Sequence, residues 1–296
     1  MRRCIKPIIL LSLVLLVIAG LHMDQPMMAD QPSSFTFAVF GDNRPSLPTQ
    51  TMPETFKRVL KAIDVVNPAF AVNTGDCIFG SYGSRKLLET QYKDYADTTK
   101  SLLRTKVYLA IGNHEILGSK ANQEFFTKEL GGSPYYSFDY EDSHFIALDS
   151  EVVGQAGKIA GEQLEWLKDD LQKSRAARHK FVFLHRPLYP VDGHMGSSMD
   201  VSPKDRDALH SLFARNRITA VFVGHEHLYN YQVRNGVWYI ITGGGGAFTY
   251  PSSRGEGDFY HFVEVKVNGD KVEMQVRKLA QGGKPAEVIP IGETVR

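Results

Sequence analysis

The chain has 296 residues, of which 43% are hydrophobic and 23% are charged, a composition typical of a globular protein rather than a disordered or fibrous one. Its 34 basic and 33 acidic residues nearly balance, so the basic surplus usual for nucleic-acid-binding domains is absent, and we expect no bulk nucleic-acid binding. Without an N-terminal export segment, roughly 265 residues remain, enough for one large α/β domain with its own core.

The N-terminus has the layout of a secretory signal peptide. A basic start, MRRCIKP, precedes an apolar stretch from Ile8 to Leu21, which is short compared with the ~20 residues of a usual membrane span. Cleavage after Gly20 and cleavage after Ala29 both fit, so residues 1–29 are expected to be a signal peptide with an uncertain cleavage site. We therefore expect an exported protein, periplasmic or extracellular. A membrane anchor formed by residues 8–21 is the alternative.

From residue 35 onward, short apolar runs alternate with amphipathic segments, which predicts strands alternating with helices. The first half is expected to contain strands at 35–40, 69–76 and 106–115, and helices at 54–66 and about 84–103. The second half is expected to contain a hairpin at 134–150, helices at 160–174 and 203–215, and strands at 180–187 and 218–227. The turn residues Asn235–Gly236 and Asn268–Gly269 predict two further hairpins near the C-terminus.

Polar residues stand at the ends of five of these apolar runs. They are Asp42, Asp76, Asn113, His185 and His225. In open α/β sheets, ligands bind at the carboxyl ends of the strands. We therefore expect these side chains to converge at one edge of the fold, although each of them alone is more readily explained as a turn or strand-end residue.

The segments that contain these residues occur in a characteristic order: GDNR (41–44), GD (75–76), GNHE (112–115), LHRP (184–187) and GHEH (224–227). Together they resemble the calcineurin-like metallophosphoesterase family, which includes purple acid phosphatases, nucleotidases and cyclic-nucleotide phosphodiesterases. The resemblance runs from about residue 35 to the C-terminal hairpins. It implies an α/β fold, a calcineurin-like β-sandwich flanked by helices in four layers (α/β/β/α), with one catalytic domain over residues 30–296.

The resemblance also implies a dinuclear metal site. Mixed oxygen and imidazole ligands suit Mn, Fe or Zn rather than Ca. By likeness to the family, Asp76 bridges two divalent ions, with one further set of ligands on each ion: Asp42 and His227 on the first, and Asn113, His185 and His225 on the second. The glycines that precede four of these residues allow the backbone to turn sharply and approach a ligand closely.

The chemistry that follows is hydrolysis of a small phosphorylated substrate. By family likeness, a metal-bridging hydroxide attacks a phosphate mono- or diester, and His114 assists the leaving group as a general acid. The sequence has no second nucleotide-binding domain after the catalytic region, which argues against the two-domain type of nucleotidase. The expected enzyme is a compact phosphomonoesterase or phosphodiesterase.

Two positions depart from the family pattern. The first segment usually reads Asp-any-His, and here it ends in Arg44, which offers only hydrogen-bond donors and cannot ligate a metal. Water could replace the lost ligand, or Arg44 could act in catalysis by binding a phosphate oxygen. Three interpretations stay open: a dimetal enzyme, an enzyme with one tight and one labile metal, and a metal-impaired exported binding protein for a phosphorylated ligand. Phe79 stands where purple acid phosphatases carry a metal-bound Tyr, so the violet iron–tyrosinate colour should be absent.

A few other residues near the motifs have simple expected roles. Cys77 is interpreted as a small buried residue, and Glu226 as a side chain that faces away from the metals. His194 borders the substrate pocket or lies in a solvated loop, and the sequence leaves both open. The run of glycines at 243–246 predicts a flexible loop beside the active edge. For three aromatic residues, core packing is favoured over stacking on a substrate ring: Phe248, Tyr250 and Phe259.

Overall fold

The computed structural model describes residues 33–129, 133–250, 257–280 and 286–295. The predicted signal peptide, residues 1–29, lies outside the described residues. Within the described ranges, none of the helices combines the length and the apolar character that a membrane crossing requires.

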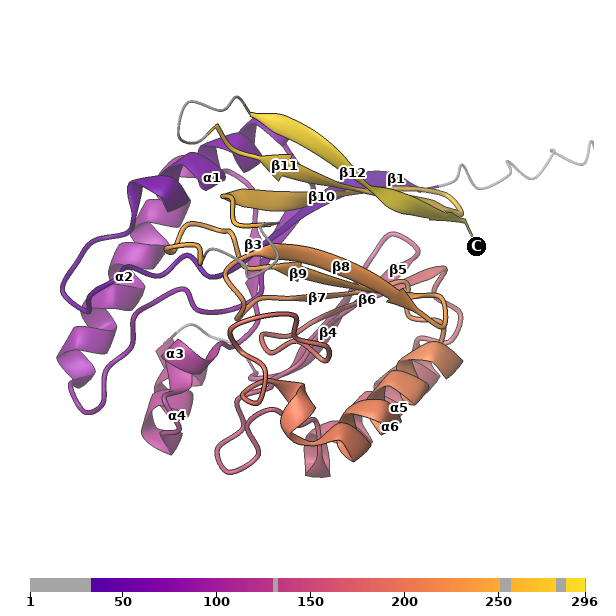
Figure 1. Ribbon diagram of the computed structural model, residues 1–296, viewed down its shortest axis with the longest axis horizontal. Helices are drawn as coiled ribbons and strands as arrows, with labels where there is room; N and C mark the ends of the chain where they lie inside the picture. The colour runs from indigo at the N-terminus through magenta and orange to yellow at the C-terminus, as the bar shows by residue number, and fades with distance from the viewer. Residues whose placement is uncertain (1–32, 130–132, 251–256, 281–285, 296) are drawn as a thin grey trace, which may run out of the picture. The chain divides into compact units, whose positions relative to one another are not determined.

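Two mixed sheets form the centre of the described structure (Figure 1). The first has the strand order β12-β11-β10-β1-β2-β3, with bounds Glu287–Val295, Lys271–Lys278, His261–Asn268, Ser34–Phe40, Phe70–Asn73 and Val107–Leu109. The second has the order β4-β5-β6-β7-β9-β8, with bounds Tyr136–Tyr140, Ser143–Ala147, His179–Phe183, Ala220–Val223, Val237–Thr242 and Tyr229–Arg234. Neighbouring strands joined by helices run parallel, and strands joined by tight turns run antiparallel.

The space between the sheets is filled mainly by phenylalanine. Phe37 of β1 is fully buried and meets Phe145 of β5 and Phe181 of β6 edge-on, with ring centroids 5.4 and 5.0 Å apart. Each such ring removes a large apolar area from water, which stabilises the fold by roughly 1.5–3 kcal/mol per side chain. This core holds the two sheets face to face, and it therefore fixes where their strand ends lie relative to each other.

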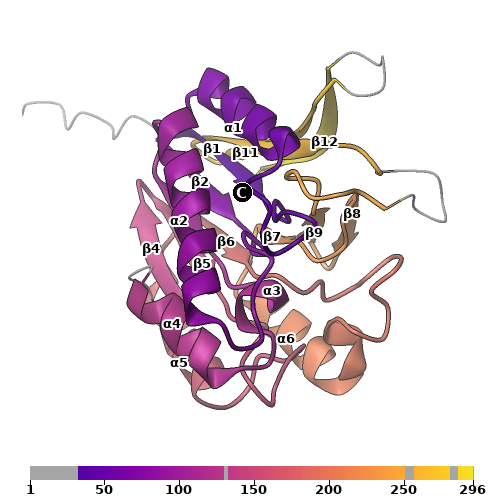
Figure 2. The ribbon, with the colours of Figure 1, turned by 90° about the vertical axis from the view of Figure 1, so that its left-hand side faces the viewer.

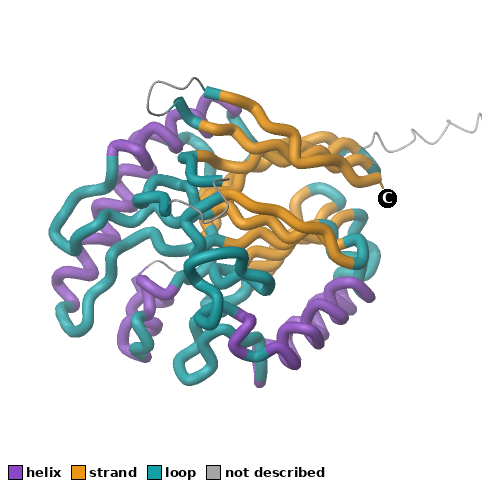
Figure 3. Tube along the Cα trace, viewed as in Figure 1, coloured by secondary structure: helices purple, strands orange, loops and turns teal. Residues whose placement is uncertain are grey.

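Helices cover the outer face of each sheet (Figure 2). Phe56 and Leu60 of α1 (Glu54–Val66) and Tyr92 of α2 (Arg85–Leu102) pack into one cluster with the first sheet. The second sheet is covered by α5 (Gly161–Lys173) and α6 (Pro203–Arg215), whose buried leucines join another cluster. This confirms the predicted sandwich with its α/β/β/α layers. Between the sheet ends and the helices, loops gather on one side (Figure 3).

The predicted helices agree with the structure to within one residue. The strands expected at 69–76, 180–187 and 218–227 end three or four residues earlier, at Asn73, Phe183 and Val223, and the segment expected at 106–115 differs more. The strand expected at 106–115 covers only Val107–Leu109, and the chain then forms two helices that the sequence analysis did not predict, α3 (Asn113–Ile116) and α4 (Lys120–Glu129). The apolar run Ala110–Ile111 leaves the sheet because the Gly112 N–H donates to the Glu115 carboxylate at 2.7 Å, which closes a tight helical turn. A short 3₁₀ helix, η1 (Met199–Val201), precedes α6.

The glycine run at 243–246 forms a loop beside Asp42, as predicted, but this loop is buried. The Gly245 N–H donates to the Gly41 carbonyl at 2.8 Å, and a Cβ on Gly245 would come within 2.2 Å of that oxygen. Glycine is required here because two backbone segments touch, and this close contact ties β9 of one sheet to the end of β1 in the other.

Candidate metal centre

The six predicted metal ligands come in equal numbers from the two sheets. Asp42, Asp76 and Asn113 follow β1, β2 and β3 of the first sheet, whereas His185, His225 and His227 follow β6 and β7 of the second. Parallel strands bring these strand ends to one edge, and the phenylalanine core brings the two edges together. The structure thus gathers residues that are up to 185 positions apart in the sequence.

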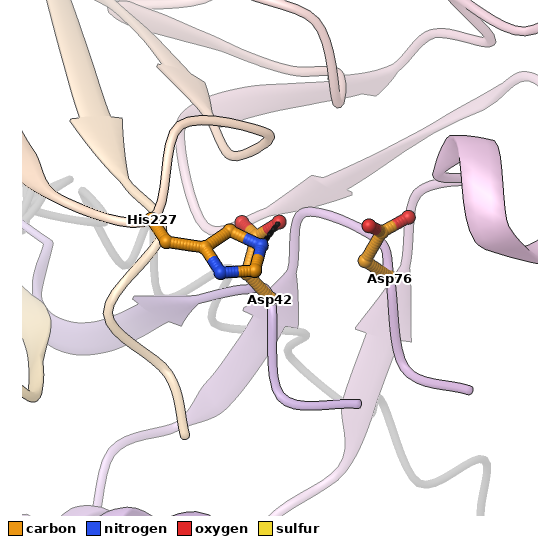
Figure 4. Close-up of side chains that lie close together, drawn as sticks. All are labelled: Asp42, Asp76 and His227. Carbon is orange, nitrogen blue, oxygen red and sulfur yellow. Dashed lines mark ion pairs between the residues drawn. The ribbon is translucent and has the colours of Figure 1, made fainter. Parts of the chain in front are cut away.

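One group consists of Asp42, Asp76 and His227, all three buried (Figure 4). Each offers one potential ligand atom, and these atoms lie within 4.8 Å of one another. The His227 Nε2 atom is 3.4 Å from the Asp42 carboxylate. Because the His227 Nδ1 atom lies 2.6 Å from the Phe248 carbonyl oxygen, which can only accept, Nδ1 carries a proton, and the lone pair of a neutral ring is on Nε2.

A second group is built around His185, which is fully buried. Its Nδ1 atom donates to the Thr74 carbonyl at 3.0 Å, while Nε2 faces two oxygens, Asn113 Oδ1 at 2.9 Å and Asp76 Oδ1 at 3.3 Å. The ring of His225 lies 5.0 Å away, and its buried Nε2 has no hydrogen-bond partner among the described residues. Lone pairs that converge without donors between them match the needs of a cation, so the side chains fit a divalent metal ion.

Three of the six candidates have left-handed backbones: Asp42 (φ 56°), Asp76 (φ 55°) and His225 (φ 69°). For non-glycine residues this conformation costs roughly 1–3 kcal/mol each, and such strain concentrates at functional sites. Backbone bonds between the loops hold it in place. The Asp42 N–H donates to the Gly75 carbonyl at 3.0 Å, and the His225 N–H donates to the Asp42 carboxylate at 3.0 Å.

Two glycines leave the carboxylates the room that they need. A Cβ on Gly112 would come within 2.4 Å of Asp76 Oδ1, and a Cβ on Gly224 within 2.3 Å of Asp42 Oδ2. Any larger residue would displace the carboxylate. The close approach predicted for these glycines is therefore present in the structure, although neither has the positive φ of a sharp turn.

Glu115 supports the site, and the sequence analysis missed this role. Its buried carboxylate accepts hydrogen bonds from the backbone N–H groups of Asp76, Cys77 and Ile78 at 2.9, 2.6 and 3.2 Å, in addition to that of Gly112. Burial and the nearby Asp76 carboxylate raise the pKa of Glu115 to about 7. The only sequence signal for this role was the Glu that follows Asn113 by two positions, at the start of a short helix.

The charges around Asp76 favour its ionised form. Burial alone would raise the pKa of this carboxyl, but the neighbouring His185 and His114 rings outweigh burial and hold the pKa well below its usual range. Burial lowers the pKa of His114, a shift that the Asp76 charge only partly opposes. The centre is therefore a buried anion surrounded by imidazoles.

Arg44 and His114 both lie near the same carboxylate oxygen of Asp76. The Arg44 Nε atom is 3.6 Å and the His114 Nε2 atom is 4.0 Å from Asp76 Oδ2. The His114 Nδ1 atom donates to the Phe79 carbonyl at 2.7 Å, which fixes the ring. Arg44 is largely buried, and its Nε has no hydrogen-bond partner in the described part of the chain. The guanidinium carbon lies 5.8 Å from the centre of the Phe79 ring, which offers no ligand atom.

Some of the predictions for the other residues near the motifs are confirmed, and some are wrong. Cys77 is buried as expected, and Glu226 turns its carboxylate to the Val191 and Asp192 N–H groups at 2.8 and 2.7 Å. His194 borders the site, with its ring centre 4.0 Å from that of His225. Core packing is correct for Phe259 but wrong for Phe248 and Tyr250, which are 64% and 45% exposed at the end of a loop.

Comparison with known proteins agrees with this geometry. The chain is 26% identical over 266 residues to human tartrate-resistant acid phosphatase type 5, a match that covers 77% of this chain and 78% of that protein. It is 28% identical to purple acid phosphatase 21 of Arabidopsis thaliana, covering 77% of this chain but only 54% of that longer protein.

Two solved structures share the fold. A dimetal phosphatase from Danio rerio superposes with a TM-score of 0.61 at 16% identity, over 87% of this chain and 99% of that one. The Plasmodium protein GAP50, an anchor in the inner membrane complex, gives 0.62 at 15% identity, over 88% and 89%. The family model described as calcineurin-like phosphoesterase matches residues 35–229, about two thirds of the chain. The chain therefore belongs to the calcineurin-like phosphoesterase family and is a metal-dependent phosphoric ester hydrolase.

Proposed function

We propose that this protein is an exported dinuclear phosphoesterase that hydrolyses a small phosphate mono- or diester. The observation that carries the proposal is the cluster of buried lone pairs around Asp76, to which both sheets contribute. Export rests on the apolar stretch that follows the basic N-terminus, and N-terminal sequencing of the protein from separated cell fractions tests it.

The proposed ligand sets meet at Asp76. Asp42 and His227 would hold one ion with it, and Asn113, His185 and His225 would hold the other. When bound, two divalent cations supply a hydroxide nucleophile near neutral pH and neutralise charge on the phosphate oxygens. The remaining catalytic roles, binding the phosphate oxygens and protonating the leaving oxygen, would belong to side chains that do not ligate the metals.

His114 and Arg44 are suited to that work. The Nδ1 bond from His114 to the Phe79 carbonyl holds the ring so that a protonated Nε2 can donate to the leaving oxygen. The Arg44 guanidinium pairs with Asp76, and its Nε makes no hydrogen bond to the described residues. Nη1 donates to the Pro45 carbonyl, so Nε and Nη2 can donate to the oxygens of a bound phosphate. Both residues would act on the substrate near the same carboxylate oxygen of Asp76.

The test compares wild type with His114→Ala on a chromogenic phosphate monoester and a chromogenic diester, with metal content measured in parallel. General acid catalysis contributes about 10²–10⁴-fold, so we expect kcat to fall by that factor while metal content is unchanged. His210→Ala is the matched control, because His210 lies on α6 and bonds Tyr239 and Asn235 instead. An unchanged kcat in His114→Ala would exclude His114 from the reaction.

A second candidate is a metal-impaired exported binding protein for a phosphorylated ligand. Arg44 favours it, because a permanent cation stands where the family provides a metal ligand. Metal-loaded wild type that hydrolyses neither ester yet binds a phosphate ester would establish this candidate and refute the enzyme. Turnover of either ester with added Mn, Zn or Fe would refute the binding protein, and the preferred ester would define the substrate class.

A further inference from the structure

A cavity of about 330 Å³ opens directly beside the candidate metal centre. His227, a proposed metal ligand, forms part of its wall together with His194, Leu228 and Tyr250. Because His227 lines the cavity and His194 packs against the ring of His225, the cavity adjoins the site where a phosphate would be hydrolysed. The part of a substrate that extends beyond the phosphate would enter this space.

Two exposed aromatic residues, Phe248 and Tyr250, form what we call the aromatic lip: Tyr250 lines the cavity, and Phe248 packs against Tyr250. The Tyr250 ring stacks on His227 with centroids 4.9 Å apart and planes 26° apart, and Phe248 meets Tyr250 edge-on at 6.0 Å and 75°. The lip is tied to the metal centre, since the Phe248 carbonyl accepts the Nδ1–H of His227. Neighbouring aromatic rings left open to water mark a ligand-binding surface.

The charges in the cavity decide what it can hold. Two acidic residues, Asp192 and Glu226, line the cavity together with the buried Leu228, and the described lining includes no lysine or arginine. A second phosphate or another anion would be repelled there. A neutral planar ring would instead stack on the aromatic surfaces, so the phosphate lies on the metal side and the ring lies on the lip.

We propose that the aromatic lip and its cavity recognise a planar aromatic ring in the leaving group of the substrate, as found in nucleotides and in aryl or arylalkyl phosphates. The proposal rests on the proposed phosphoesterase function and adds the class of ester that it prefers. Two pairs of probes isolate the ring. Adenosine 5′-monophosphate and ribose 5-phosphate share the same ester and differ in the base. Benzylphosphonate and ethylphosphonate cannot be hydrolysed at their C–P bonds and differ in the ring.

With metal-loaded full-length protein, we expect the KM for adenosine 5′-monophosphate to be at least about tenfold lower than the KM for ribose 5-phosphate. Calorimetry should give a Kd for benzylphosphonate that is lower than the Kd for ethylphosphonate by a similar ratio. Stacking of one base on an aromatic side chain is strong enough to produce ratios of this size. Tyr250→Ala and Phe248→Ala should remove most of both ratios. Tyr250→Phe keeps the ring and should keep both ratios. Tyr231→Ala is the matched control, because Tyr231 is also 45% exposed and stacks on Trp238 of β9 instead.

The outcomes separate this proposal from the function on which it rests. Equal affinities within both pairs, or ratios that survive Tyr250→Ala, would overturn the aromatic lip even if both phosphate esters are hydrolysed. A benzylphosphonate preference that depends on Tyr250 would support the lip even if neither ester is hydrolysed, in which case the phosphoesterase function fails. A preference confined to the phosphonate pair would support the lip and identify an arylalkyl or aryl ester rather than a nucleotide.

Discussion

Arg44 is the single residue that most alters the chemistry expected of this site. Its Nε atom lies 3.6 Å from Asp76 Oδ2. The guanidinium brings a permanent positive charge to the sequence position at which the family usually has a neutral histidine ligand. A unit charge and a divalent ion ~5 Å apart repel each other by roughly 2–7 kcal/mol at effective dielectric constants of about 80 to 20. If the ligands divide as proposed, the ion at Asp42 and His227 should therefore bind more weakly than the ion at Asn113, His185 and His225.

Arg44→His should strengthen the weaker metal site, because it removes the repulsion and restores a ligand. We expect the Kd for that ion to fall at least about tenfold, equivalent to ~1.4 kcal/mol. Metal content after dialysis against a weak chelator, together with calorimetric titration of Mn or Zn, measures the change. Arg58→His, which changes an arginine on α1 outside the candidate centre, is the control. Identical metal content in wild type and Arg44→His would mean that Arg44 does not weaken the site.

At the scale of elements, His144 joins the β4–β5 hairpin to α5. Its Nδ1 atom is 2.6 Å from the carboxylate of Asp139 on β4, and its Nε2 atom is 2.9 Å from that of Asp170 on α5. Burial alone would lower the pKa of His144, but the hydrogen bonds to Asp170 and Asp139 outweigh burial and raise it above the ordinary value of 6.5. The histidine has no part in the candidate centre, and its contribution is to the packing of α5.

This arrangement predicts that the free energy of unfolding depends on pH. Because the folded-state pKa is raised, the stabilisation is complete below about pH 6.5 and is lost as the pH rises through the folded-state pKa. His144→Gln should abolish that part of the dependence, which we expect to be about 1.5 kcal/mol, the lower end of the range for a hydrogen bond to a charged group. Urea unfolding of both proteins with saturating metal at pH 6 and pH 9 tests it. Parallel pH dependences of the two proteins would contradict the assignment.

Across the whole molecule, the candidate metal centre is a junction between the sheets. Three of its ligands follow strands of the first sheet and three follow strands of the second, and the buried glycine run adds a backbone contact between β9 and β1. A cation bound at this junction interacts with the folded state only, because unfolding separates ligands that are far apart in the chain. Metal binding and the association of the sheets are therefore thermodynamically linked.

Removal of the metals should lower the melting temperature of the entire domain rather than loosen one loop. Metal present at 100 times its Kd adds ~2.7 kcal/mol to the free energy of unfolding, which corresponds to a shift of several degrees for a protein of this size. Calorimetry of chelator-treated and Mn-reloaded protein measures this shift. His227→Ala should reduce it, whereas His210→Ala should not. A melting temperature that is insensitive to metal in wild type would argue against a centre that joins the sheets.

Local sequence patterns were enough to predict most of the elements and the chemical nature of the candidate ligands, but not α3 and α4. Helical spacing of Phe56, Leu60 and Ile63 and the turn at Asn235–Gly236 are local signals, and both correspond to elements of the structure. The ligand motifs are local signals too, because each motif occupies a few consecutive residues. Their order along the chain was therefore enough to indicate the family. The proposed division of the ligands between two ions stays a prediction.

Tertiary structure alone decided which segments touch. The chain pattern predicted a flexible glycine loop and a core position for Tyr250, but the first is buried against Gly41 and the second is exposed beside His227. It also did not predict that Glu115 accepts hydrogen bonds from the loop of Asp76 or that Arg44 lies beside the same Asp76 carboxylate. Such contacts join residues tens to hundreds of positions apart. They depend on how two sheets close over a shared core, a property that no local sequence pattern encodes.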